Sequence, residues 1–413
     1  HGKAFTWYME NGHLSNALTH AIAANDLNRL VQLIEKYAFT IFDQNKASTF
    51  LNWLNTIPEA VMGSNPWLYI ARAWLLAYLG QLEEIEPLLI EAEKHADQSN
   101  HRLMGYISAM WTLMGELRSV RVDGLLHATR AFELLPPDEY RARAFVGYHM
   151  SNILAWRGDI LPALKALEMT TTWSLVAGDL EMAVTAQFEK ASILHALGKL
   201  GESLQAFKST FQMVDSDYPD KRNRSLPMGF AYLQLSSLYL EWNNTSEALR
   251  LAKEGIHICR WWGYQDYLYN GLLKLADVFL AIGDKDGALS TIREAKDVFC
   301  NNPTSSSVQG QEAVINLARG DLESASAWAA CCDLSPNDDI DFFHRFIYLY
   351  YASILQEQGN LWEASGVLER LGNILEQAGA ITLLLETLSQ RIIILSKMSE
   401  DEQALSLLQH ALD

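Results

Sequence analysis

Residues that could carry catalysis or hold a metal are scattered along this sequence rather than grouped. None of the eleven His lies in a His-Glu-x-x-His pattern, and none of the four Cys lies in a Cys-x-x-Cys pair. Zinc sites need such spacings because the ligands must converge on one ion. The adjacent Cys331 and Cys332 lack that spacing. The sequence therefore predicts no metal centre, and so few Cys favour a reducing, cytoplasmic setting.

Phosphate chemistry is also not indicated. A Walker loop needs glycines whose amides surround the phosphates, followed by Lys and then Ser or Thr. Gly198 and Lys199 come closest, but Leu200 follows them and Ile193 stands where the first Gly should be. We therefore expect no nucleotide cofactor in this segment and do not expect it to be an enzyme.

The strongest pattern is a repeat of about 40 residues in which one Gly ends a helix and a small residue follows five positions later. The Gly and small-residue pairs are Gly158 and Ala163, Gly198 and Ser203, Gly283 and Ala288, Gly320 and Ala325, and Gly359 and Ala364. Gly can adopt the left-handed conformation that ends a helix. The small residue lets the second helix approach the first closely.

Two further repeats keep the small residue but lack the Gly. Ala248 follows Asn243 and Asn244, and Ala404 follows Ser399 and Glu400. Apolar residues recur at helical spacing almost throughout, and Pro is sparse. The sequence therefore predicts an all-α fold, a superhelix of tandem helical hairpins similar to a tetratricopeptide α-solenoid.

We expect residues 1–413 to form one continuous superhelix, because no linker interrupts the pattern. Residues 1–105 form an entry segment with less regular hairpins, and residues 106–413 carry the regular repeats. Ile85 departs from the pattern, since the register after Gly80 asks for a small residue there.

The common register predicts which residues of the first helices face the concave groove. They combine aromatic rings with amide, hydroxyl and carboxyl groups, as a site for a polar ligand would. The predicted ligand-binding residues are Tyr148, Asn152, Trp156, Phe188, Ser192, His195, Ser237, Asn270 and Asp277. A groove that meets only water could carry the same residues. The set contains no Lys or Arg, which favours a neutral small molecule over a peptide carboxylate.

The overall charge limits the partners of this segment. The chain has 32 Lys plus Arg against 50 Asp plus Glu, a formal net charge of -18. Binding to a nucleic-acid backbone or to an anionic membrane surface needs a basic patch. We therefore expect no direct contact with nucleic acid or membrane, and the apolar stretches are too short to span a bilayer.

Several segments resemble the sensor region of the large ATP-dependent LuxR-type transcription regulators, the family of the maltose-regulon activator. They are the entry segment at residues 1–27, which includes Trp7-Tyr8-Met9-Glu10-Asn11, then residues 51–58, 65–68 and 73–76, and late in the chain Leu317-Ala318-Arg319-Gly320-Asp321 up to Trp328. The resemblance spans nearly the whole chain.

The resemblance implies that this segment senses a small effector and works with neighbouring domains of a longer chain. In such regulators an ATP-binding switch precedes the sensor and a helix-turn-helix module follows it. Effector and ATP together favour a self-associating form that activates transcription. ATP is therefore expected in an upstream domain, outside this segment.

Two other functions remain open from the sequence. The groove could hold a peptide or partner helix, as many tetratricopeptide arrays do. The same sensor could also be attached to a kinase. The identity of the effector is not encoded in any motif.

Overall fold

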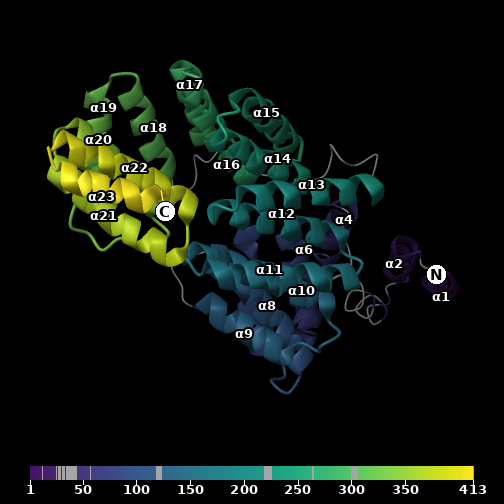
Figure 1. The fold of residues 1–413 in the computed structure, drawn as a ribbon. Helices are drawn as coiled ribbons and strands as arrows, with labels where there is room; N and C mark the ends of the chain where they lie inside the picture. The colour runs from purple at the N-terminus through teal and green to yellow at the C-terminus, as the bar shows by residue number, and fades with distance from the viewer. Residues whose placement is uncertain are drawn as a thin grey trace. The chain divides into compact units, whose positions relative to one another are not determined.

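The computed structural model describes residues 1–11, 13–24, 44–55, 57–117, 123–217, 226–262, 265–298 and 306–412, together with residues 26, 29 and 33. Throughout these ranges the regular elements are helices, and no strand occurs among them (Figure 1). The predicted all-α class is confirmed. No helix within the described ranges has both the length and the apolar character needed to cross a membrane.

The described helices follow one another in antiparallel pairs. They are α1 (Gly2–Glu10), α2 (Leu14–Ala23), α4 (Gln44–Leu54), α5 (Glu59–Ser64), α6 (Trp67–Tyr78), the 3-10 turn η2 (Leu82–Glu84), α7 (Ile85–His95), α8 (His101–Leu117), α9 (Asp123–Leu134), α10 (Tyr140–Trp156), α11 (Ile160–Val176), α12 (Leu180–Ala196), α13 (Leu200–Asp217), α14 (Leu226–Glu241), α15 (Thr245–Trp262), α16 (Gln265–Ala281), α17 (Lys285–Val298), α18 (Ser306–Ala318), α19 (Leu322–Cys331), α20 (Arg345–Glu357), α21 (Leu361–Ala378), α22 (Ile381–Lys397) and α23 (Asp401–Leu412).

The turns inside the hairpins have the conformation that the repeat predicted. All five predicted glycines have positive φ, between 73° at Gly198 and 90° at Gly320. Where the Gly is absent, Asn243 (φ 55°) and Ser399 (φ 63°) take the same conformation. The repeat therefore requires the left-handed conformation at this position, and Gly is the residue that adopts it with the least strain.

The small residues after these turns are buried, as the pattern required. Ala163, Ala288, Ala325 and Ala364 are completely inaccessible to solvent. Ser203 is equally buried, and its hydroxyl donates to the Ala191 carbonyl oxygen at 2.7 Å. The two helices of a hairpin approach closely here, because a larger side chain would find no space.

The early part departs from the regular repeat at Ile85, where we expected a small residue. Ile85 is fully buried as the first residue of α7. The 3-10 turn η2 stands between Gly80 and this helix. This extra turn gives the hairpin a different geometry, so a large apolar residue fits.

The chain divides into two compact units by its internal contacts, and the single continuous superhelix over residues 1–413 stays a prediction. The N-terminal unit contains His1–Ile153 and Met169–Met182, and the C-terminal unit contains Leu154–Glu168 and Ala183–Asp413. Helices α10, α11 and α12 contribute residues to both. The division crosses helices rather than a linker.

Each unit has its own apolar core. In the N-terminal unit α6 and α8 contribute the largest share, with Leu68, Ile70 and Ile107 almost fully buried. In the C-terminal unit Leu272, Ile292 and Ile315 are completely buried where α16, α17 and α18 pack. These cores hold the first helices of successive hairpins side by side, which positions their polar faces.

Candidate polar groove

Polar side chains link the first helices of neighbouring hairpins, about one repeat apart. The Lys274 ammonium donates to the Ser237 hydroxyl at 2.9 Å, and the Gln390 amide donates to the Ser353 hydroxyl at 2.9 Å, each across 37 positions. In the N-terminal unit the Asn152 amide donates to Glu116 at 2.9 Å across 36 positions. These contacts form a polar ladder along the first helices.

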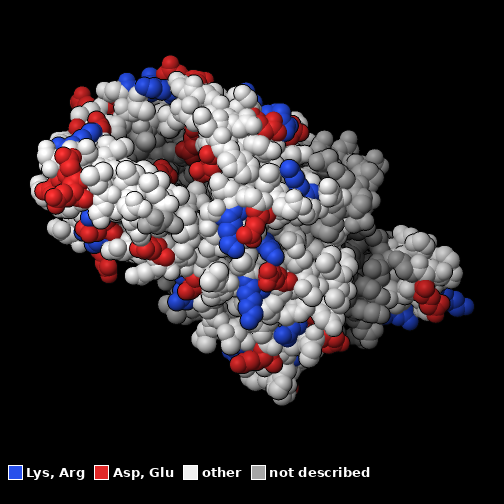
Figure 2. Space-filling view, viewed as in Figure 1, with Lys and Arg blue, Asp and Glu red and all other residues white. Residues whose placement is uncertain are grey.

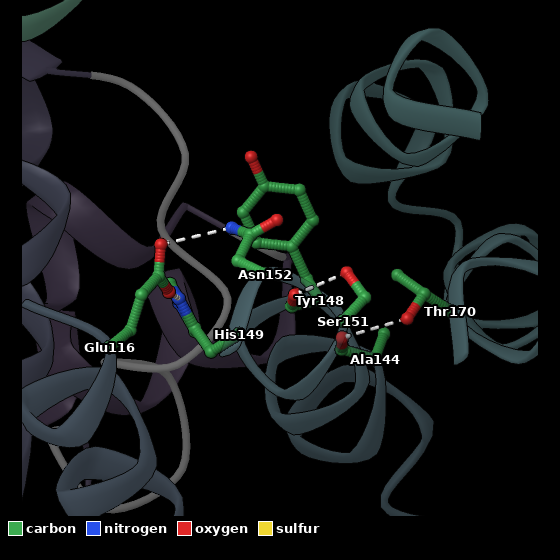
Figure 3. A network of polar contacts seen from close by, with 7 residues as sticks. All are labelled: Glu116, Ala144, Tyr148, His149, Ser151, Asn152 and Thr170. Atoms are coloured by element: carbon green, nitrogen blue, oxygen red, sulfur yellow. Dashed lines mark hydrogen bonds and ion pairs between the residues drawn. The ribbon is translucent and has the colours of Figure 1, made fainter. Parts of the chain in front are cut away.

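In the N-terminal unit the ladder is centred on Glu116 of α8. One oxygen of its carboxylate accepts from Asn152, and the other contacts His149 Nδ1. The side chains of Glu116 and His149 are each only 12% exposed. Figure 3 shows Tyr148 and Asn152 on the same side of α10, with Glu116 across from them. The arrangement places an amide and a phenol on one side of α10.

In the C-terminal unit the ladder continues through α14, α16 and α18. The Gln311 amide donates both to the Leu273 carbonyl oxygen at 3.0 Å and to the Asp277 carboxylate. Gln311 is 2% exposed, so these bonds fix its orientation. Lys274 and Asp277 follow each other by one turn of α16, which places the ammonium and the carboxylate on one helix face.

Figure 2 shows the C-terminal unit hollowed beside α16 and α18, with acidic side chains along the edge of the hollow. The side chains of Asp277 and Glu386 are exposed to solvent, but protein atoms of neighbouring helices lie around their carboxylates and displace part of the water. Burial consequently raises the pKa of Asp277 to about 6, although the Gln311 hydrogen bond and the Lys274 charge oppose the rise.

Glu386 of α22 and Tyr350 of α20 share this electrostatic environment. Burial, followed by repulsion from Asp277 and Glu241, raises the pKa of Glu386 to about 7. Burial, followed by the charges of Asp277 and Glu386, raises the pKa of the Tyr350 phenol well above its usual range. Neither Glu386 nor Tyr350 forms a hydrogen bond or ion pair with another described residue. A carboxyl and a phenol with shifted pKa values and no such partner are available to a ligand.

The predicted site residues separate into two sets. Tyr148 and Asn152 lie together in the N-terminal unit. In the C-terminal unit Ser237 and Asp277 belong to the ladder, and Asn270 is exposed on α16. The two sets belong to different compact units, so we treat them as separate surfaces.

The remaining predicted residues have specific protein neighbours. The Trp156 ring meets Phe343 edge-on, with centroids 6.2 Å apart. The Ser192 hydroxyl donates to the Phe188 carbonyl oxygen within its own helix. His195 Nε2 lies 3.6 Å from Glu241, and its side chain is 14% exposed.

Phe188 corrects the prediction, because it does not line the groove. It is completely buried and packs against Phe207 and Phe211, with ring centroids at 5.9 and 5.3 Å. The register assigned Phe188 to the solvent-facing side of α12. Its ring lies instead on the side that packs against α13.

Sequence reasoning missed Lys274, Gln311, Tyr350 and Glu386. A signal was available for two of them, since Ser237, Lys274 and Gln311 recur every 37 residues on successive first helices. The presence of Lys274 also removes the argument that the inner face holds no basic residue. Among the described residues no three His, Cys, Asp or Glu side chains are placed to hold a metal.

Comparison with known proteins identifies the family. The model of the MalT-like TPR region matches residues 121–413. This chain belongs to the MalT-like TPR family. A relative, the HTH-type transcriptional regulator MalT of Serratia proteamaculans (strain 568), is 25% identical over 299 residues, which is 70% of this chain and 32% of that protein. The chain thus spans about a third of the length of this relative.

Solved structures with the same kind of fold include three that are similar over most of this MalT-like TPR chain. A Rap protein complexed with Competence and Sporulation Factor has a TM-score of 0.62 at 11% identity, covering 85% of this chain and 97% of that one. The Cut9-Hcn1 hetero-tetramer of the APC/C has a TM-score of 0.55 at 13% identity, covering 99% of this chain and 79% of that one. The apo form of the quorum sensor NprR from B. thuringiensis has a TM-score of 0.50 at 13% identity, covering 86% of this chain and 98% of that one. Identities this low establish the fold alone.

Proposed function

We propose that this MalT-like TPR chain is the effector-sensing and signal-transmitting part of a LuxR-type transcription activator. It binds a small effector in the polar groove of its C-terminal unit and passes the event to neighbouring domains of a longer cytoplasmic protein. An ATP-binding switch and a DNA-binding module in that longer protein, and self-association of the activated form, belong to the same proposal. The chain itself does not contact nucleic acid or membrane.

The observation that carries the proposal is the state of Glu386 and Tyr350. Around them Lys274, Asp277 and Gln311 are held in place by hydrogen bonds or charge, as the walls of a preorganised site are. Glu386 and Tyr350 have no such partner among the described residues, so a bound ligand would meet two available polar groups on a fixed polar surface.

Calorimetric titration of the purified chain against a metabolite library tests this proposal. For a ligand found in this way, Glu386→Gln and Tyr350→Phe should each weaken binding about tenfold or more, because each removes a direct polar contact. Glu402→Gln, an exposed position on α23, is the matched control and should leave the affinity unchanged. Asn152→Ala reports on the N-terminal unit separately.

Unchanged affinity in both groove variants would place the ligand elsewhere. A loss confined to Asn152→Ala would assign binding to the Glu116 and Asn152 surface. Lack of binding by any small metabolite would leave the function as sensor without support.

The second candidate function is a scaffold that binds a peptide or a partner helix. The similarity in fold to the Rap protein, solved with Competence and Sporulation Factor, supports considering it. Lys274 adds a cationic group on the inner face, which a carboxylate of a peptide could use. Titration with a peptide library distinguishes the two, since a scaffold would bind peptides while metabolites give no heat.

A further inference from the structure

The C-terminal unit contains a contact between two segments that lie far apart in the sequence. The Thr382 hydroxyl, in the first turn of α22, donates to the His195 carbonyl oxygen at the end of α12 at 2.6 Å. The two residues are 187 positions apart. The intervening hairpins α13 to α21 therefore lead the chain back to the helix from which they depart.

Apolar contacts accompany this hydrogen bond. Gly198, in the turn after α12, lies so near α22 that a Cβ there would be 2.9 Å from Ile381 Cγ2. The opposite arrangement occurs at Gly379, where a Cβ would be 3.5 Å from Leu197 Cδ2. The two turns thus fit together, each with a Gly facing a branched side chain. We call Leu197, Gly198, Gly379, Ile381 and Thr382 the closure contact.

A second pair of segments meets in the same way. A Cβ at Gly158, in the turn between α10 and α11, would be 3.1 Å from Phe342 Cγ and 3.3 Å from Ala378 Cβ. The neighbouring Trp156 ring packs edge-on against Phe343. This contact lies in the same unit and supports the closure contact.

The closure is slight in comparison with the packing between hairpins. Ile381 remains 36% exposed, Trp156 37% and Phe343 43%. Residues in the hairpin interfaces, such as Ile292 and Leu368, are completely buried. Because the free energy of an apolar contact follows the area removed from water, the closure contact is the weak joint of an otherwise well-packed unit.

The helices that meet at the closure contact also carry the polar groove. On α22 Glu386 and Gln390 follow Thr382 by one and two turns, and Gln390 bonds to Ser353. On α12 the His195 ring faces Glu241, while its own carbonyl oxygen accepts from Thr382. The closure contact therefore connects two helices that also carry polar residues of the groove.

We propose that the closure contact is a two-state joint coupled to the groove: it opens and closes, and a ligand that touches both α22 and the α12 to α16 wall favours the closed state. This inference rests on the proposed sensing function for the identity of the input, but the joint itself is a property of the free chain. Linkage requires that whatever weakens closure also weakens binding of such a ligand.

The test uses two variants of the closure contact and one control in the full 413-residue chain. Ile381→Asp places a charge against the Gly198 turn, and Thr382→Val removes only the hydrogen bond. Ile393→Asp is the control, because it puts the same charge on α22 at a position that is already 53% exposed. Circular dichroism confirms the helix content of each variant.

Amide hydrogen exchange and small-angle X-ray scattering report on the joint without a ligand. We expect exchange in residues 193–204 to rise at least tenfold in Ile381→Asp and by a smaller factor in Thr382→Val, with a larger radius of gyration in the former. Ile393→Asp should match the wild type. Wild-type exchange and dimensions in both closure variants, with helix content preserved, would overturn the joint.

Coupling to the groove has its own readout, the titration of Glu386 followed by carboxyl NMR. Opening should lower the pKa of Glu386 from about 7 toward its ordinary value, since it relieves the burial and the repulsion from Asp277 and Glu241. An open joint with an unchanged Glu386 titration would overturn the coupling. A joint that behaves as expected in a chain that binds no metabolite would contradict the proposed function while leaving the joint intact.

Discussion

At the scale of single residues, the inner face uses its polar side chains to connect the repeats as well as to offer a site. Asn152, Ser237 and Asp277 were chosen from the sequence as ligand contacts, and each bonds to a residue of the neighbouring hairpin. Burial of a polar group is costly unless it is hydrogen-bonded, so this pairing is what a superhelix with a polar interior requires. Glu386 and Tyr350 lack such a bond to another described residue, so they are the groups that point to a ligand.

The raised pKa of Glu386 predicts a pH dependence of stability. Between its ordinary pKa of 4.5 and about 7 the folded chain holds a proton that the unfolded chain has lost, so stability falls as pH rises through this window. Glu386→Gln should therefore unfold at higher urea than wild type at about pH 8, by on the order of 1 kcal/mol after solvent screening is allowed for. At about pH 4 the two should coincide.

Glu402→Gln is the control for this measurement, as an exposed carboxyl on α23. A stability difference between Glu386→Gln and wild type that is equal at both pH values would mean that the effect comes from packing and not from the proton.

At the scale of elements, the same left-handed turn conformation recurs from hairpin to hairpin, while the type of residue that adopts it varies. Ser399 occupies the left-handed region with φ 63° between α22 and α23, where the preceding hairpins from α10 to α21 have Gly or Asn. A residue with a Cβ is strained there, by about 1 kcal/mol or more. Ala404 behind this turn is still buried, so the hairpin forms in spite of the strain.

Ser399→Gly should consequently stabilise the chain by about 0.5–1 kcal/mol, because relief of the strain exceeds the added freedom of the unfolded chain. The matched change Ser406→Gly, at an exposed position inside α23, should destabilise it by a similar amount, since Gly weakens a helix interior. Urea unfolding measures both. Destabilisation by Ser399→Gly would show that the serine conformation is not strained.

At the scale of the whole molecule, the net charge limits which part of a longer protein could bind DNA. The net charge of -18 belongs to a chain that matches the TPR region of a DNA-binding regulator but spans only 32% of that relative. The proposed function thus assigns the basic DNA-reading surface to another part of the longer protein. The acidic chain then repels phosphate at long range.

We therefore expect the isolated chain not to bind a duplex of about 20 base pairs at micromolar concentration and physiological salt. Fluorescence anisotropy of a labelled duplex measures this, with a basic protein of similar size as the positive control. Binding that weakened steeply with added salt would reveal a phosphate-contacting surface and contradict the expectation.

The sequence alone determined the fold and its repeat. Helix-ending residues act locally through backbone conformation. The small residue five positions later acts through the distance between the two helices of one hairpin, so the spacing of both can be recognised in the sequence. The entry segment and the stretch from Leu317 to Trp328 gave the resemblance to the LuxR-type regulators. The match to the MalT-like TPR family confirms the family and covers residues 121–413, which contain the second stretch but not the entry segment.

Only the tertiary structure decided which contacts the candidate site residues make. Three features depend on how successive hairpins rotate: the face on which Phe188 lies, the partners of Asp277, and the contact of Thr382 with His195 across 187 positions. A small rotation per repeat adds up along the array. The raised pKa of Glu386 likewise depends on burial and on the carboxylates of Asp277 and Glu241, which come from two other helices. Such properties arise from summed geometry and summed charge, which no local pattern in the sequence records.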